Sequence, residues 1–168
     1  ARMTIEKLFA PGAIGGLTIK NRWVRSATSE MMALASGEVT DQYADLYETL
    51  ARGGAGLMFA GMMYVQPRGR YIAKMAGIHD NAMIPALSRV TARVHDAGGI
   101  IFGELGHAGS QSRDPEVTPL APSPVENFVS RRAPEEASES EILAAVEAFA
   151  YAARRLREAG FDGVHVHA

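Results

Sequence analysis

The sequence predicts an α/β fold built around a parallel β-sheet. The main observation is a unit that occurs three times: a helix-like segment, a glycine pair or Ala-Gly, and a short apolar run. Glycine ends many helices because it adopts the left-handed backbone conformation at little steric cost. The apolar runs lack polar–apolar alternation, which is typical of strands covered on both faces. Strands and helices that alternate in this way form parallel sheets with right-handed crossovers.

A hairpin and a strand are predicted before the first unit. Residues 13–19 contain a glycine pair between apolar residues, which favours a tight turn between two short strands. Asn21–Ala27 contains Trp23 and Val24 and is predicted to be the first strand of the sheet.

The three units predict three helices and three further strands. We expect helices over Thr40–Arg52, Ala82–Ala97 and Ser138–Ala159, and strands over Leu57–Ala60, Ile100–Gly103 and Val164–His167. Ser138 and Glu141 match the capping box that begins many helices, and Thr40 is the expected N-cap of the first helix. The third helix should bury one apolar stripe, formed by Ile142, Val146, Phe149, Ala153 and Leu156.

Two connections are unusually long, and both follow predicted strands. They are Thr28–Val39 and Gly106–Ala137. Structureless loops longer than about 12–15 residues are usually functional, and the active sites of α/β folds lie at the carboxyl ends of the strands. We therefore expect these loops to line a site; the alternative is that they only decorate the surface.

The composition excludes several classes of protein. The chain has 168 residues, 47% of them apolar, with 17 basic and 19 acidic side chains, a formal net charge of −2 and no cysteine. Disulfides, Cys-ligated metals and thiol nucleophiles are therefore excluded. The scattered basic residues argue against a nucleic-acid partner, and no apolar run approaches the roughly 20 residues that span a membrane. Because no signal-peptide pattern opens the chain, we expect a single cytoplasmic domain.

Polar side chains stand at the predicted strand ends. Glu104 follows an apolar run, where a carboxylate needs a partner, and it could hold a ligand N–H, act as a base or ligate a metal. His165 and His167 are two residues apart on a strand and therefore point to the same face. With Glu104 they would form a two-His, one-carboxylate metal site; the alternative is one ligand-facing and one structural histidine. His107 lies among glycines that allow a ligand to approach closely.

A series of short motifs runs along nearly the whole chain. They are Leu8-Phe9-Ala10-Pro11, Leu17-Thr18-Ile19-Lys20-Asn21-Arg22, Gly53-Gly54-Ala55-Gly56-Leu57, Pro67-Arg68-Gly69-Arg70, Gly77-Ile78-His79-Asp80, Leu105-Gly106-His107-Ala108-Gly109 and Ala159-Gly160-Phe161-Asp162-Gly163-Val164-His165-Val166-His167-Ala168. Each motif alone is weakly specific. The ordered series resembles the old yellow enzyme family, the FMN-dependent NADH:flavin oxidoreductases and ene-reductases.

The resemblance implies an FMN-containing (β/α)8 TIM barrel that reduces activated C=C bonds of α,β-unsaturated carbonyl compounds with NADH or NADPH. Because a complete barrel needs about 250 residues, residues 1–168 would form the N-terminal half of a single FMN-binding domain, with about four β/α units after the hairpin. Such a chain would be inactive alone. Its free strand edges would favour a homo-oligomer or pairing with a C-terminal half.

The family's residue roles carry over to the matching positions of this chain. His167 would bind the substrate carbonyl as the catalytic donor, which stabilises the enolate that develops. Ala168 and Met31 would also contribute to the substrate site. The flavin would contact Ser26, Ala27, Thr28, Ser29, Met62, Glu104 and His167.

Some positions depart from the family pattern. Glu104 stands where Gln is usual, so an ionised Glu104 would accept from the flavin N3–H and disfavour negative charge on the reduced flavin. Ala27 replaces a usual Pro, Ser110 a usual Arg and His165 a usual Glu. No metal is expected in this interpretation. Two other functions stay open: a metal-dependent hydrolase-type barrel using His165, His167 and Glu104, and a non-catalytic half-barrel assembly module.

Overall fold

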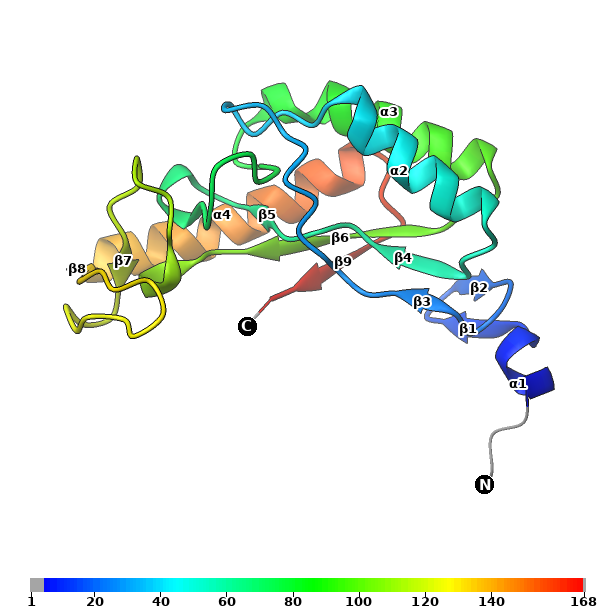
Figure 1. The fold of residues 1–168 in the computed structure, drawn as a ribbon, viewed down its shortest axis with the longest axis horizontal. Helices are drawn as coiled ribbons and strands as arrows, with labels where there is room; N and C mark the ends of the chain where they lie inside the picture. Colours follow the sequence, from blue (N-terminus) through cyan, green and yellow to red (C-terminus); the bar gives the residue numbers. More distant parts are fainter. Residues whose placement is uncertain (1–4, 168) are drawn as a thin grey trace.

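The structure is a computed structural model that describes residues 5–167. Its elements, in chain order, are α1 (Ile5–Phe9), β1 (Gly12–Ile14), β2 (Leu17–Ile19), β3 (Val24–Arg25), α2 (Asp41–Arg52), β4 (Leu57–Phe59), β5 (Met63–Tyr64), the 3-10 turns η1 (Pro67–Gly69) and η2 (Asn81–Met83), α3 (Ile84–Asp96), β6 (Ile101–Gly106), η3 (Gly109–Gln111), β7 (Leu120–Ala121), β8 (Glu135–Glu136), α4 (Glu139–Glu158) and β9 (Gly163–Val166) (Figure 1).

The main sheet is parallel, and its strands are neighbours in nearly the order in which they occur along the chain. β3 pairs with β4 through Val24 and Leu57, and β4 pairs with β6 through Met58 and Ile101. β5 continues beyond β4 along the same edge of β6, and β9 pairs with the opposite edge. Consecutive β/α units of a (β/α)8 barrel have this arrangement, which confirms the predicted parallel α/β sheet.

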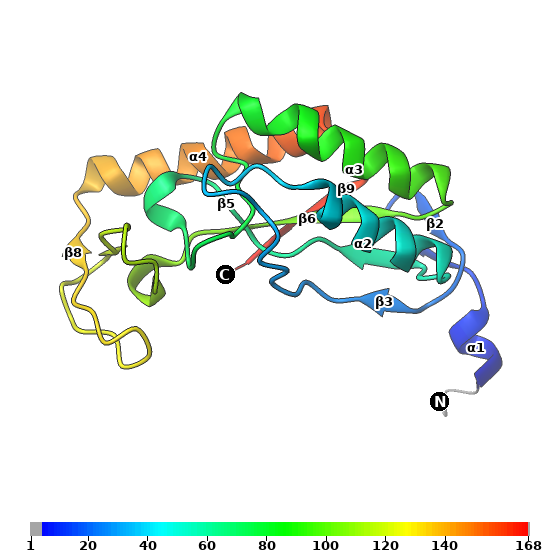
Figure 2. The ribbon, with the colours of Figure 1, turned by 45° about the horizontal axis from the view of Figure 1, so that its top comes forward.

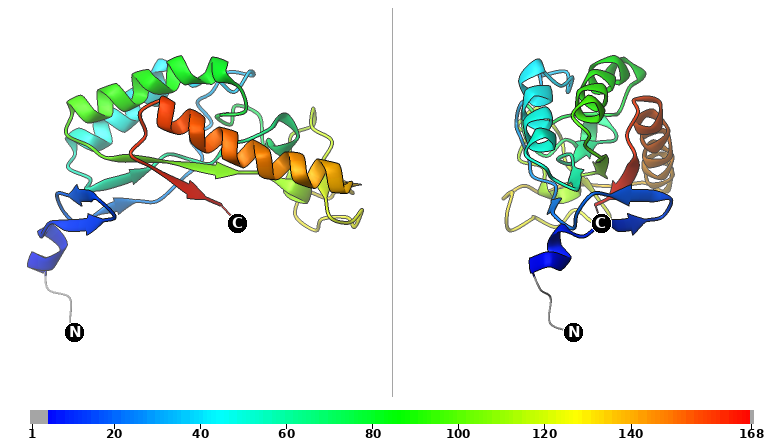
Figure 3. Two further views of the ribbon diagram at one scale, coloured as in Figure 1. Left: turned by 180° about the vertical axis from the view of Figure 1, so that it is seen from behind. Right: turned by 90° about the vertical axis from the view of Figure 1, so that its right-hand side faces the viewer.

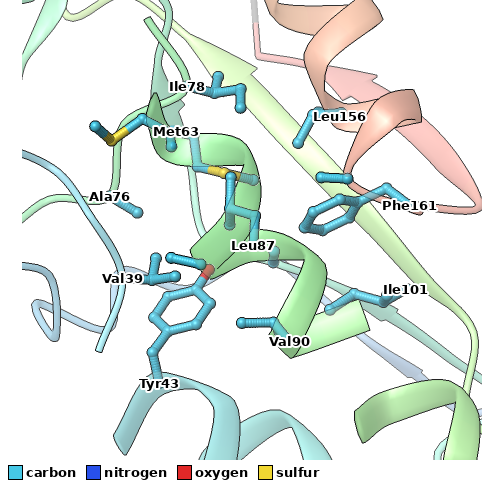
Figure 4. Close-up of a cluster of buried hydrophobic side chains, with 14 of the residues drawn as sticks. Val39, Tyr43, Met63, Ala76, Ile78, Leu87, Val90, Ile101, Leu156 and Phe161 are labelled. Atoms are coloured by element: carbon cyan, nitrogen blue, oxygen red, sulfur yellow. The ribbon is translucent and has the colours of Figure 1, made fainter. Parts of the chain in front are cut away.

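Three helices cover one face of this sheet. Figure 3 shows α2, α3 and α4 side by side along that face, and each helix contacts the next. The core lies between helices and strands, where the side chains of Tyr43, Leu87, Val90, Ile101 and Leu156 are at most 1% exposed (Figure 4). Burial of an apolar side chain of this size contributes about 1.5–3 kcal/mol, so this layer holds the strands in place.

The other face of the sheet carries aromatic and polar side chains. The rings of Phe59 on β4 and Phe102 on β6 pack edge to face with centroids 5.5 Å apart. The imidazole of His165 lies edge-on to Phe59, at a centroid distance of 5.1 Å. Because alternate residues of a strand share a face, Glu104 lies on the same side as Phe102.

The expectation that all the apolar runs are covered on both faces is wrong for the last strand. Val164 and Val166 of β9 are 39% and 55% exposed. Among the described residues, β9 pairs only with β6, so it forms an edge of the sheet. By contrast, the side chains of β6 are almost all buried.

The helix boundaries agree with the sequence pattern, with two differences. The capping box of Ser138 and Glu141 is present at the start of α4. Thr40 precedes α2 as expected, but its hydroxyl donates to the carbonyl of Met32 at 2.7 Å and does not cap the helix. The second helix begins at Ile84, later than predicted, because residues 81–83 form the 3-10 turn η2.

The predicted apolar stripe of α4 is only partly buried. Leu156 is fully buried, whereas Ile142 is 49% and Val146 is 64% exposed. The first half of α4 extends beyond the sheet, as Figure 2 shows, and only its second half packs on the core.

The two ends of the sheet differ in construction. The hairpin β1–β2 and helix α1 lie where the strands begin, and the long connections lie where the strands end (Figure 1). Gly106–Ala137 is more ordered than expected, because it contains η3 and the parallel pair β7–β8. Within residues 5–167, every helix is too short or too polar to cross a membrane.

Candidate active site

A cavity of about 290 Å³ lies at the carboxyl ends of the strands. Its walls come from the segments that follow β3, β4, β6 and β9 and from the loop after β5. The lining residues are Ala27, Thr28, Ser29, Met62, Tyr71, Met75, Glu104, His107, Ala108, Gln111 and His167. The parallel sheet explains this convergence, because parallel strands end at the same edge.

Most of the predicted flavin residues line this one cavity. Ala27, Thr28 and Ser29 follow β3 directly, Met62 lies between β4 and β5, and Glu104 lies on β6. Ser26 does not line it. The carbonyl of Ser26 instead accepts from the guanidinium of Arg25 at 3.0 Å and from the hydroxyl of Thr28 at 3.3 Å.

Glu104 is shared by two imidazoles. Its carboxylate is buried, and the register of β6 and β9 places it opposite His165. The Nδ1 atom of His165 lies 3.1 Å from Oε1 of Glu104. The Nδ1 atom of His167 is hydrogen-bonded to the same oxygen at 3.2 Å. The prediction that the two histidines share a face is thus confirmed.

His107 closes another part of the wall. Its Nδ1 accepts from the backbone N–H of Gly109 at 3.1 Å, so Nε2 carries the proton of the neutral ring. Nε2 is buried and has no hydrogen-bond partner among the described residues. Burial, and secondarily the charge of Arg68, lower the pKa of His107 below its usual value, which keeps the ring neutral.

A buried network supports the strand ends from the side of α2. The side chain of Glu30 is only 4% exposed and accepts from Arg25 at 3.2 Å and from the hydroxyl of Tyr47. The backbone N–H of Gly61, just after β4, donates to that hydroxyl at 3.0 Å and to Glu30 at 3.2 Å. Burial and the neighbouring Glu30 carboxylate raise the pKa of Tyr47, so this hydroxyl stays protonated. The network ties β3, α2 and the segment after β4 together.

The sequence patterns missed part of the wall. Tyr71 and Met75 lie in the connection between β5 and α3, which is not among the two long connections that the sequence predicts, and Gln111 lies in η3. Residues 65–80 contain no helix longer than the turn η1. The length of this connection was the signal that could have identified it.

Two predicted substrate residues are not part of this wall. Met31 is half-exposed, has a positive φ of 53° and lines a neighbouring depression of about 520 Å³. Ala168 lies outside the described residues. Their roles at the substrate remain predictions.

The hydrolase-type metal site gains no support from this geometry. The Nδ1 atoms of both imidazoles lie 3.1 and 3.2 Å from the same carboxylate oxygen of Glu104. These are the distances of direct contacts between the side chains. In residues 5–167, no three His, Asp or Glu side chains are grouped so as to hold a metal ion.

Known proteins resemble the chain over nearly its whole length. It is 35% identical over 161 residues to a metal reductase of Desulforamulus reducens and 34% identical over 165 residues to an NADH oxidase of Thermoanaerobacter brockii. Each alignment covers 95% of this chain but only 24% or 25% of the relative, so the chain spans about a quarter of their length. The solved old yellow enzyme homologue from Zymomonas mobilis is 29% identical and superimposes with a TM-score of 0.85, over 96% of this chain and 48% of that one.

These similarities agree with the geometry. The superposition on an old yellow enzyme homologue confirms the predicted barrel-type α/β fold. The family match extends over residues 7–168, which include every element of the sheet and the described part of the cavity. The chain therefore belongs to the NADH:flavin oxidoreductase / NADH oxidase family.

Proposed function

We propose that this chain binds the ring system of FMN as part of an NAD(P)H-dependent oxidoreductase that reduces activated C=C bonds of α,β-unsaturated carbonyl compounds. One observation carries the proposal: side chains from four separate segments, each expected at the flavin, line a single cavity. They are Ala27, Thr28, Ser29, Met62, Glu104 and His167. Membership of an NADH:flavin oxidoreductase family supports the cofactor and the hydride donor.

The chemistry of the cavity fits a flavin ring. Ala27, Met62 and Ala108 offer a small, apolar wall to a flat aromatic group. Oε2 of Glu104 has no hydrogen-bond partner among the described residues and can accept from the N3–H of the ring. No lining residue of the described chain is Lys or Arg, so this cavity suits the ring and not the phosphate. When bound, FMN supplies hydride transfer between the nicotinamide and the substrate.

His167 is the residue that we propose for binding the substrate carbonyl. Because its Nδ1 is hydrogen-bonded to Glu104, Nε2 is the atom left to contact the carbonyl oxygen. Nε2 donates when the ring carries both protons, and such a donor stabilises negative charge that develops on the oxygen. We assign Ala168 and Met31 to the substrate side of the same site.

Titration of FMN fluorescence with the purified chain tests the cofactor proposal. We expect quenching on binding, and we expect Ala27→Trp, which fills the cavity, to weaken the affinity at least about tenfold, or about 1.4 kcal/mol. Ala13→Trp is the matched control, because Ala13 is exposed in the hairpin β1–β2. Equal affinities of both variants would contradict binding at this cavity.

The activity belongs, in our proposal, to a complete barrel domain that includes residues 1–168. The chain alone should then oxidise no NADH in the presence of 2-cyclohexen-1-one, a simple enone, whereas the complete domain should do so. We further propose that the chain acts in the cytoplasm, and that it self-associates or pairs with a complementary C-terminal half. NADH oxidation by the chain alone would contradict the inactive state.

A further inference from the structure

The Glu104 carboxylate is buried on a face of the sheet where few groups can compensate its charge. Its side chain is 7% exposed, and a carboxylate so buried is costly without a charged or hydrogen-bonding partner. Among the described residues, the ionisable side chains paired with it are His165 and His167, both on the β9 side. From β4, the neighbouring side chain on this face is the apolar ring of Phe59, which packs on His165.

The two imidazoles are held to different degrees. His165 lies within β9, directly opposite Glu104 in the strand register, and its ring packs edge-on against Phe59. Phe59 is in turn fixed against Phe102. His167 follows the end of β9, and its side chain is 62% exposed, compared with 49% for His165. His165 is therefore the better-anchored of the two partners.

Both contacts use the same carboxylate oxygen. Nδ1 of His165 and Nδ1 of His167 lie 3.1 Å and 3.2 Å from Oε1 of Glu104. The His167 contact has hydrogen-bond geometry and the His165 contact lies at ion-pair distance, and an ionised carboxylate oxygen has a lone pair for each. Oε2 is then the acceptor that remains for a ligand.

We propose that His165 is a positioning residue for Glu104 and, through it, for His167. The contact of His165 with Oε1 fixes the carboxylate, leaves Oε2 free at the cavity wall, and keeps Oε1 in reach of Nδ1 of His167, so that Nε2 of His167 is turned to the ligand. The assignment of that ligand as a flavin and a carbonyl substrate rests on the proposed function. The pairing of the three side chains does not.

The first test reads the proton positions and needs no cofactor. In side-chain 15N NMR spectra of the chain, we expect His165 and His167 to be protonated at Nδ1. His95 is an internal control, because it contacts Asp162 through Nε2, at 3.0 Å, and should show Nε2–H. Glu104→Met should remove the Nδ1–H preference of His165 and His167 and leave His95 unchanged. His165 found as Nε2–H in the wild-type chain, or unchanged by Glu104→Met, would overturn the proposal.

The second test measures coupling through FMN affinity. We expect His165→Leu to weaken FMN binding about tenfold in the wild-type background and less than about threefold in the Glu104→Gln background. His165→Gln, whose amide N–H can still donate, should stay within about threefold of wild type. Equal losses in both backgrounds would overturn the positioning role. If no variant binds FMN, the proposed function fails, and the NMR result alone decides the positioning of Glu104 by His165.

Discussion

At the scale of single residues, Glu104 supplies a buried carboxylate to the cavity wall. The sequence predicts that Glu104 faces a ligand, and the cavity wall contains it. The sequence groups Glu104 with His165 and His167 only as one alternative, a metal site. That both imidazoles meet one oxygen of Glu104 could not be predicted, because residue spacing shows that the two histidines share a face but not which neighbouring strand they meet. That information lies in the register of β6 and β9, which only the folded chain defines.

Replacement of Glu104 by Gln should raise the reduction potential of bound FMN. A buried carboxylate disfavours negative charge on the reduced ring, whereas an amide of the same shape does not. We expect an increase of about 30 mV, which corresponds to about 1.4 kcal/mol for a two-electron couple. Redox titration of the FMN-loaded protein measures it, with Glu136→Gln, an exposed change on β8, as the control. Equal potentials would refute the prediction.

His107 should make folding stability depend on pH below about 6.5, the usual pKa of histidine. Because burial lowers its pKa in the folded chain, the unfolded chain binds the proton more readily. The contribution of His107 is therefore present above the unfolded pKa and is lost as the pH falls below it. Between pH 7 and pH 5, the free energy of unfolding measured in urea should fall less for His107→Asn than for wild type. The two falls should differ by less than about 1.4 kcal/mol per pH unit.

His79 is present in both wild type and His107→Asn. Its pKa is also lowered, mainly by burial, so it contributes to the pH dependence of both proteins. A difference between wild type and His107→Asn therefore isolates His107. Parallel pH profiles would contradict the prediction.

At the scale of elements, the sequence predicts features that depend only on neighbouring residues. The capping box places the start of α4, and the glycine pair places the β1–β2 turn, because both depend on residues a few positions apart. The exposure of Ile142 and Val146 could not be predicted from neighbouring residues. Periodicity identifies the apolar face of a helix but does not show how far the sheet extends beneath it.

Tyr47→Phe should destabilise the chain by about 1–3 kcal/mol, because it leaves Glu30 and the N–H of Gly61 with one buried partner fewer. The substitution keeps the ring that packs between α2 and the strand ends. Tyr151→Phe on α4 is the matched control, because Tyr151 is 55% exposed and should change stability by less than about 0.5 kcal/mol. Urea unfolding monitored by circular dichroism measures both. Equal stabilities would show that the buried network around Glu30 contributes little.

At the scale of the whole molecule, helices cover one face of the sheet, and within residues 5–167 β9 pairs on one side only, with β6. The alternation of strands and helices is sufficient to predict a parallel sheet, and the motif series is sufficient to predict the barrel type. The exposure of Val164 and Val166 depends on which neighbours are present beside β9, and the strand's own residues do not determine that. An exposed apolar strand edge favours association with another chain.

Val166→Lys should therefore reduce self-association of the chain. A lysine at a sheet edge disfavours pairing with a second strand, because its charge must stay hydrated. We expect sedimentation velocity to show a larger monomer fraction for Val166→Lys than for wild type at equal concentration. Thr18→Lys, an exposed change in the hairpin, should leave the fraction unchanged. A monomeric wild-type chain at every concentration would contradict the prediction.

The separation between the two ends of the sheet has a consequence for how this protein can change over evolutionary time. The hairpin β1–β2 and α1 lie at the end where the strands begin, and the cavity lies at the opposite end (Figure 1). Insertions and substitutions in the loops can therefore alter the chemistry of the cavity while the hairpin end keeps the strands aligned. Residues that set specificity are thus separate from residues that hold the scaffold together. Relatives that catalyse different reactions can therefore share one fold.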